Sequence, residues 1–228
     1  MTHDTAPTDA LVVDDLALLL FDPRTGAVVG DGMPLFHVLA GAVLIDLVVA
    51  DRVRLEHPRR GLDQVRTVGG TRPETPVLAT AWDEIDRKPM DVYTMVLVLG
   101  PRLRDPVLDR LVERGHLRRE PGRGLFRVAR LAEADGTRRR DLVAAMRDVL
   151  VDGAPPSTHH AAVAALLSAS GQLAAMHADI PWSGEVHTRG KKLERSAWAA
   201  TTAGQAVQVG MASLIATNLF TATSILAD

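Results

Sequence analysis

The chain has 228 residues, of which 46% are hydrophobic but only 4% aromatic, and its formal net charge at pH 7 is −2. This length fits one sizeable domain with a core of aliphatic side chains, which favours packed helices. The chain has no cysteine, which excludes a disulfide framework, a thiolate zinc site and a cysteine nucleophile, and suits a reducing compartment.

The N-terminal segment carries acidic rather than basic side chains, and the apolar run Leu16–Phe21 is too short for a secretory signal. We therefore expect residues 1–10 to be disordered, residues 11–228 to form a single domain, and the protein to be cytoplasmic. Asp14 or Asp15 can cap a short helix that runs to Leu20, and the turn-forming residues from 22 to 26 should end it. Residues 27–29 are typical of a brief strand.

The strongest helical signal follows Pro34. In Leu35–Ala50 apolar side chains fall on every face of a helix, which predicts a helix that is buried on all sides. The alternation after Arg52 predicts an edge strand ending at His57. Residues 57–76 are rich in Pro, Gly, Arg and Thr and indicate an irregular excursion, followed by a helix over 76–87.

A helix and a hairpin are predicted in the middle of the chain. Asp105 can accept orphan amide hydrogens and Pro106 suits a first helical position, so a helix should begin here and end at Gly115. Segments 116–119 and 125–130 flank a turn at 120–124 that contains Pro and Gly, a pattern typical of a β-hairpin.

Three further helices are predicted toward the C-terminus. One covers 141–151, and a longer one is capped by Ser157 or Thr158 and runs to about Met176. Residues 196–226 carry no charge, but they contain glutamine, asparagine and several hydroxyl side chains. Because each of these groups would need a partner in hydrocarbon, we expect a buried core helix there rather than a membrane span.

Positive charge is concentrated in the middle of the chain. Residues 102–147 contain 13 arginines and 7 acidic residues, whereas the whole chain has a net charge of −2. Two interpretations stay open for this segment. It can form an ordinary solvated surface, or a patch that faces an anionic partner.

The familiar catalytic patterns are missing from the sequence, which has no Gly-rich phosphate loop, G-x-S-x-G elbow, H-E-x-x-H pair or EF-hand loop. His159 and His160 would point apart on a helix, so a surface pair is favoured over a metal site. We interpret His37 as a hydrogen-bonded core residue. We predict no enzyme activity, no metal and no cofactor. Three carboxylates fit a solvated helix face: Asp83, Glu84 and Asp86.

Three motifs, in this order, resemble the Golgi phosphoprotein 3 family. They are DDLALLLFD (Asp14–Asp22, with Gly26 after it), AGAVLIDLVVADRVRLE (Ala40–Glu56), and LVERGHL (Leu111–Leu117) before the hairpin. Family members carry a run closely similar to the second motif, and the resemblance extends over essentially the whole chain. Arginine far outnumbers lysine, which is typical of GC-rich bacterial coding, so we expect a bacterial member.

The resemblance implies an all-α, mainly helical fold in which a hydrophobic central helix is ringed by amphipathic helices and a β-hairpin protrudes. Eukaryotic members bind phosphatidylinositol 4-phosphate and hold glycosyltransferases in the Golgi. This chain is therefore expected to associate peripherally with membranes, bind an anionic lipid and engage client membrane proteins. The hairpin is expected to form contacts between copies through six residues: Leu117, Arg118, Arg119, Leu125, Phe126 and Val128.

The lipid pocket that the resemblance implies is altered in this chain. Asp31 stands where the family has a tryptophan, while Ala40 and Pro101 stand where it has arginines. Only Arg104 is retained, and Arg102 lies close enough to substitute. A phosphomonoester needs several arginine contacts, and Asp31 should repel it. We expect Arg104 and Arg102 to meet an anionic headgroup, with weaker phosphoinositide binding than in the family.

Two functional hypotheses follow. The first is a non-enzymatic peripheral membrane protein, acting as a scaffold, that binds anionic headgroups through its arginine-rich segment. The second is a winged-helix-like nucleic-acid-binding protein, because a helix followed by a basic hairpin is also what that module offers. Acidic residues alternate with arginines along the 105–114 helix, so nucleic acid is the less favoured partner.

Overall fold

The structure is a computed structural model that describes residues 10–56, 64–121 and 130–196. The helices are α1 (Val12–Leu20), α2 (Met33–Val49), α3 (Pro76–Arg87), α4 (Val92–Leu99), α5 (Arg104–Glu113), α6 (Thr137–Arg147), α7 (Thr158–Ala169) and α8 (Gly184–Ser196), with a 3₁₀ turn η1 (Gly100–Arg102) and a π-helical turn η2 (Asp148–Asp152). The strands are β1 (Phe21–Asp22), β2 (Ala27–Val28), β3 (Val53–Glu56), β4 (Gln64–Thr67), β5 (Met90–Asp91), β6 (Leu117–Glu120) and β7 (Arg130–Glu133). The fold is mainly helical, as predicted, but it is not purely all-α.

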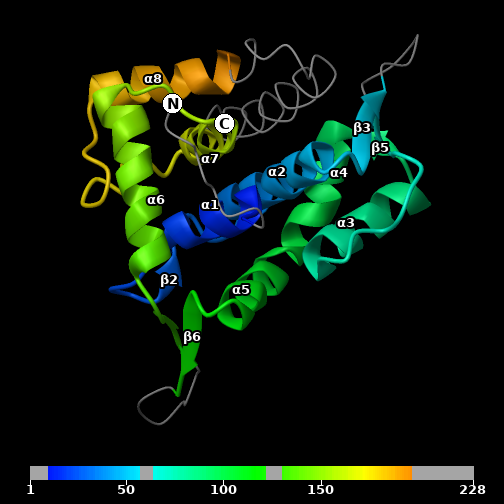
Figure 1. Cartoon of the computed structure of the whole chain (residues 1–228), viewed down its shortest axis with the longest axis horizontal. Helices are drawn as coiled ribbons and strands as arrows, with labels where there is room; N and C mark the ends of the chain where they lie inside the picture. The colour runs from blue at the N-terminus through cyan, green and yellow to red at the C-terminus, as the bar shows by residue number, and fades with distance from the viewer. Residues whose placement is uncertain (1–9, 57–63, 122–129, 197–228) are drawn as a thin grey trace, which may run out of the picture.

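Helix α2 is the central element. It packs against α1, α3, α4, α5 and α7, and the side chains from Leu35 to Val48 are buried with the exception of Phe36, which is half-buried. Figure 1 shows α1 and α2 crossing the middle of the molecule, with α3, α4 and α5 on one side and α6, α7 and α8 on the other. The predicted central hydrophobic helix is confirmed.

Helix α1 begins earlier than predicted, and its two aspartates are not caps. Asp14 and Asp15 lie within the first turns and are both buried. The capping role falls instead to Asp46 of α2, whose carboxylate oxygens accept hydrogen bonds from the amides of Val12 (2.8 Å) and Val13 (3.0 Å). These amides have no partner within their own helix, so a side chain from the central helix satisfies the start of α1.

Three small antiparallel sheets connect the helices. β1 pairs with β2, β6 pairs with β7, and the third sheet has the strand order β3-β4-β5. The predicted edge strand after Arg52 is confirmed as β3. The expectation that residues 57–76 form only an irregular excursion is wrong, because β4 lies within this range and pairs Val65 with Leu55.

The predicted helix over 76–87 is found with those bounds as α3, whereas other helix limits differ. α5 begins one residue before Asp105, α6 begins at Thr137 rather than 141, and α7 ends at Ala169, well before Met176. Ser157 does cap α7, since its Oγ accepts a hydrogen bond from the amide of His160. Helices α4 and α8 were not predicted.

The predicted hairpin is described in part. The strand that pairs with β6 is β7, with Leu117 opposite Glu133 and Glu120 opposite Arg130. Of the predicted return strand at 125–130, only Arg130 lies within the described residues, and β7 continues from it to Glu133. Residues 1–9, the contact residues Leu125, Phe126 and Val128, and the C-terminal helix predicted for 196–226, apart from its first residue, lie outside the described residues.

Candidate functional site

A cleft with a cavity of about 540 Å³ lies between α5, the β1–β2 turn and the β6–β7 hairpin. Three guanidinium groups from separate segments line it, those of Arg104, Arg119 and Arg130, together with Asp105 and Asp109. Arg104 opens α5, while Arg119 and Arg130 come from the two hairpin strands. The family-derived arginine is thus combined with two hairpin arginines, of which Arg119 was predicted to serve contacts between copies.

Arg104 is held by two carboxylates. Its Nε and Nη2 atoms donate to Asp31 Oδ1 (2.9 Å) and Oδ2 (2.7 Å), and its Nη1 donates to Asp105 Oδ1 (2.9 Å). The hydrogen bonds from Arg104 lower the pKa of Asp31. Asp31 was expected to repel a headgroup as an isolated charge. In the structure it compensates the charge of Arg104, so a ligand would have to compete with it.

Arg102 is not part of the cleft. Its side chain is 63% exposed, and its Nη1 lies 3.4 Å from Glu84 Oε2 on α3. We predicted that Arg102 would replace a lost pocket arginine beside Arg104. The structure does not bring Arg102 and Arg104 together in one pocket. Ala40 is fully buried within α2 and Pro101 is exposed in η1.

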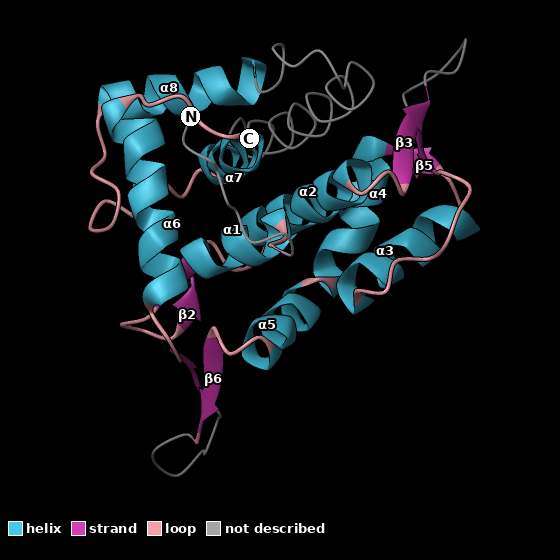
Figure 2. Cartoon of the chain, viewed as in Figure 1, coloured by secondary structure: helices cyan, strands magenta, loops and turns pink. Residues whose placement is uncertain are grey.

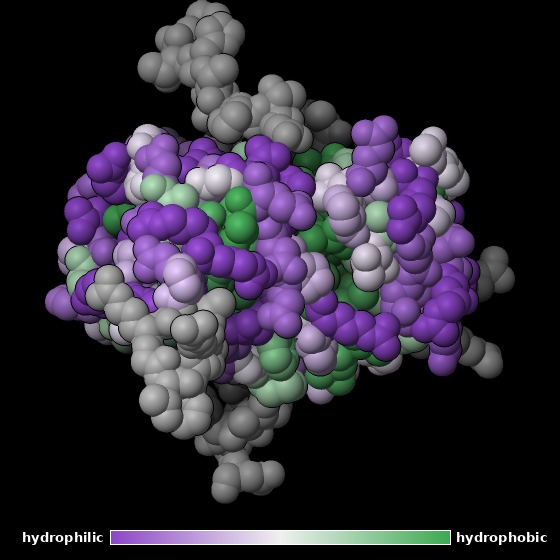
Figure 3. Space-filling view, turned by 90° about the horizontal axis from the view of Figure 1, so that it is seen from below, coloured by the Kyte–Doolittle hydropathy of each residue, from purple (hydrophilic) through white to green (hydrophobic). Residues whose placement is uncertain are grey.

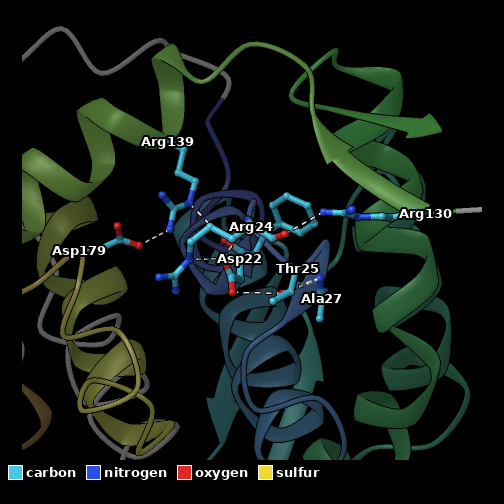
Figure 4. A network of polar contacts seen from close by, with 8 residues as sticks. Asp22, Arg24, Thr25, Ala27, Arg130, Arg139 and Asp179 are labelled. Carbon is cyan, nitrogen blue, oxygen red and sulfur yellow. Dashed lines mark hydrogen bonds and ion pairs between the residues drawn. The ribbon is translucent and has the colours of Figure 1, made fainter.

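Gly26 of the β1–β2 turn lines the cleft, and Figure 4 shows the polar contacts around this turn. Asp22 Oδ1 accepts hydrogen bonds from the Arg24 amide (2.9 Å) and from Arg24 Nε (3.0 Å), and the Arg24 carbonyl accepts one from Arg130 Nη2 (2.9 Å). Gly26 has φ = +71°, and a Cβ atom there would lie 2.5 Å from the Leu131 carbonyl oxygen. Only glycine lets the hairpin approach this turn and place Arg130 beside it.

Arg119 approaches the cleft from β6 and pairs with Asp109 on α5, and both side chains are about half exposed. By contrast, Leu117 on the same strand is buried in the core of this chain at 1% exposure. Leu117 thus packs within its own chain, whereas Arg118 and Arg119 are exposed, and the expected contacts between copies stay a prediction.

Several other arginines of the 102–147 segment are used inside the molecule. Arg110 Nε lies 2.9 Å from Asp14, Arg138 Nε donates to Asp15 (3.0 Å), and Arg139 pairs with Asp179 in the contact shown in Figure 4. Arg139 is buried, and Arg110 and Arg138 are partly buried. The segment thus presents only part of its positive excess as a surface.

The histidines and carboxylates that the sequence singled out differ in their burial and in their contacts within the chain. His159 Nε2 lies 2.7 Å from Asp15 Oδ2, so it is not a simple surface residue. His37 is buried, but its Nε2 has no hydrogen-bond partner, which contradicts the predicted hydrogen-bonded state. Asp83 is half exposed and pairs with Arg72, whereas the Glu84 side chain is only 11% exposed. Within residues 10–56, 64–121 and 130–196, no three His, Asp or Glu side chains are grouped closely enough to hold a metal.

Seen from below the view of Figure 1, one face is mainly hydrophilic, with hydrophobic side chains showing in patches between polar ones (Figure 3). None of the helices in the described part of the chain combines the length and hydrophobicity needed to cross a bilayer.

Comparison with known protein families gives a match over most of the chain. A family model described as Golgi phosphoprotein 3 (GPP34) matches residues 12–209. The match contains all three sequence motifs and every residue that lines the cleft. No curated protein matches the chain.

Proposed function

The chain belongs to the Golgi phosphoprotein 3 family, and on that basis we propose that it is a non-enzymatic peripheral membrane protein that binds anionic lipid headgroups in the cleft beside α5. The observation that supports this most is the convergence of Arg104, Arg119 and Arg130 on one cavity of about 540 Å³. Guanidinium groups offer paired donors that match phosphate oxygens, and this volume falls in the range of small-ligand sites.

A headgroup would have to displace existing ion pairs. Arg104 and Asp31 are 33% and 42% exposed, and Arg119 and Asp109 are 56% and 51% exposed. Exposed pairs of this kind contribute only about 0–1 kcal/mol, so a phosphate with two charges can replace a carboxylate. The acids lower the net attraction of the cleft. We therefore infer a site of modest affinity that discriminates weakly among anionic lipids.

Arg102 contributes from outside the cleft in this proposal. Its side chain is 63% exposed, and the residue ends η1 just before α5 begins. A basic residue near an anionic bilayer contributes about 1 kcal/mol without a specific contact. Arg102 would then strengthen attachment to the surface, while Arg104 would contact the headgroup.

Liposome flotation tests the proposal. Vesicles of phosphatidylcholine alone are compared at low salt with vesicles that also contain phosphatidylinositol 4-phosphate, phosphatidylinositol or cardiolipin. We expect the wild-type protein to float with the anionic vesicles, and Arg104→Ala and Arg130→Ala to float less. Arg54→Ala is the matched control, because Arg54 is an exposed arginine on β3, outside the cleft. If no anionic vesicle is bound, the proposal is wrong.

Two further roles belong to the same proposal. The exposed Arg118 of the hairpin remains a candidate for contacts between copies, and scaffolding of client membrane proteins remains a candidate role once the protein is attached to a membrane. Nucleic acid is the weaker alternative, because α5 presents Asp105 and Asp109 beside Arg104 in the cleft. A gel shift with random duplex across a salt series would reveal nucleic-acid binding through a steep salt dependence.

A further inference from the structure

A second cavity, of about 370 Å³, lies where α1, α2, α3 and α7 meet, and it shares no lining residue with the arginine cleft. Its walls include the aliphatic side chains of Ile45, Leu78 and Ala162, and Val49, at 58% exposure, also borders it. Two ionisable residues, Asp46 and His159, line the same space. The cavity is therefore apolar with a small polar region.

Asp46 has unused capacity to accept hydrogen bonds. Its carboxylate accepts from the amides of Val12 and Val13, and no residue in the described ranges forms an ion pair with it. A carboxylate offers about four acceptor positions, of which two are taken here. Only 6% of the residue is exposed, so the negative charge of its ionised form is desolvated, and none of the described residues compensates it by an ion pair.

The side chains around Asp46 are engaged with other partners. His159 Nε2 lies 2.7 Å from Asp15 Oδ2, so this nitrogen contacts Asp15 and not Asp46. The ionisable side chains whose charges reach Asp46 are Asp14 on α1 and His159 on α7. Asp14 is itself paired with Arg110. Among the residues that the structure describes, no cation bonds to Asp46 in this polar region.

We propose that this cavity binds a small hydrophobic amine, whose ammonium group donates hydrogen bonds to Asp46 while its hydrocarbon body packs against Ile45, Leu78 and Ala162. An ammonium group supplies up to three donors and the positive charge that the buried carboxylate lacks. An alcohol of the same length would supply a donor without the charge. A fatty acid would place a second carboxylate beside Asp46, so it should be excluded.

Thermal unfolding of the full chain, followed by circular dichroism, tests the proposal with three probes of equal length: n-hexylammonium, n-hexanol and n-hexanoate. At saturating hexylammonium and pH 8 we expect Tm to rise by about 2–4 °C. Hexanol should give a smaller rise, and hexanoate should give none. Burial raises the pKa of Asp46 to about 7, so calorimetric affinity for hexylammonium should increase from pH 6 to pH 8 as the carboxylate ionises.

Two variants and a control locate the site. Asp46→Asn removes the charge, and Val49→Trp fills the border of the cavity at an exposed position. Each should lower hexylammonium affinity by about tenfold or more. Leu97→Trp is the matched control, because Leu97 is 37% exposed on α4, outside the cavity. Equal responses to all three probes, no response of the wild type, or an unchanged response of both variants would overturn the proposal.

Discussion

Asp46 is a single side chain that links the central helix to the start of α1, and its burial raises its pKa from 3.8 to about 7. Between these two values the unfolded chain has released this proton while the folded chain keeps it. Protonation therefore favours the folded state. The stabilisation is fully present below about pH 4 and is lost as pH rises through 7.

The replacement Asp46→Asn should remove this pH dependence. A shift of about three units corresponds to roughly 4 kcal/mol, so the free energy of unfolding of the wild type relative to the variant should fall by about that amount from pH 4 to pH 8. Urea denaturation at a series of pH values measures the difference. Asp15 affects stability in a different pH range, at lower pH. Hydrogen bonds from His159 and Arg138 outweigh its burial and lower its pKa. A difference between the two proteins that is constant with pH would contradict the prediction.

The sequence located such residues but could not assign their partners. Asp14 and Asp15 precede an apolar run, which is where a cap is expected, yet Asp14 pairs with Arg110, which is 96 positions away. Asp15 pairs with Arg138 over 123 positions, and Asp46 reaches Val12 over 34 positions. Local patterns carry no information about such distant partners. The same reason explains why the Asp31–Arg104 pair was not foreseen.

Elements with strong local signals were predicted well. α2 is apolar on all faces and α3 begins at a proline, and both were found near their predicted positions. Helix α4 has the sequence VYTMVLVL, whose β-branched residues do not indicate a helix. It forms because Asp91 Oδ1 accepts the Thr94 amide hydrogen at 3.0 Å and because Val92, Met95, Val96 and Leu99 pack into the core. Tertiary packing overrides propensity there.

Helices α1, α6 and α7 meet at Asp15. Its side chain is 4% exposed and contacts Arg138 of α6 and His159 of α7, which are 23% and 19% exposed. Asp15→Ala would leave Arg138 without its counter-charge and His159 Nε2 without its hydrogen-bond partner. We expect a loss of roughly 2–4 kcal/mol in the free energy of unfolding, somewhat below the range for fully buried pairs.

A matched variant separates this effect from a general loss of an ion pair. Asp83 of α3 and Arg72, which lies before that helix, form an exposed pair, with side chains 48% and 55% exposed. Asp83→Ala should therefore destabilise the fold much less than Asp15→Ala does. Chemical denaturation of both variants gives the comparison. Equal losses would show that Asp15 does not join the three helices in the way described.

At the scale of the whole molecule, the uneven charge of the sequence is largely an internal match between segments. Residues 102–147 hold 13 of the 26 basic residues, and several of these arginines pair with acids that lie outside the segment, at Asp14, Asp15, Asp31 and Asp179. Composition alone shows the excess of positive charge in this segment, but it does not show where these charges lie in the folded chain. Among the described arginines, the partly exposed ones around the cleft stay accessible to a partner, as do Arg102 and Arg118 outside it.

The acids of the cleft should therefore limit lipid binding, and removing one should strengthen it. Asp31→Asn removes one of the two carboxylates that hold Arg104, and Asp109→Asn removes the carboxylate that pairs with Arg119. Each change should raise the affinity for anionic vesicles by about fivefold, equivalent to about 1 kcal/mol. Asp83→Asn alters the net charge by the same amount away from the cleft. Flotation at low salt should show a gain for the first two variants and little change for the third. The gains from the two cleft variants should shrink at higher salt, because salt screens the exposed charges. A similar gain for all three variants would mean that the overall charge of the protein, rather than these arginines, governs its attachment to vesicles.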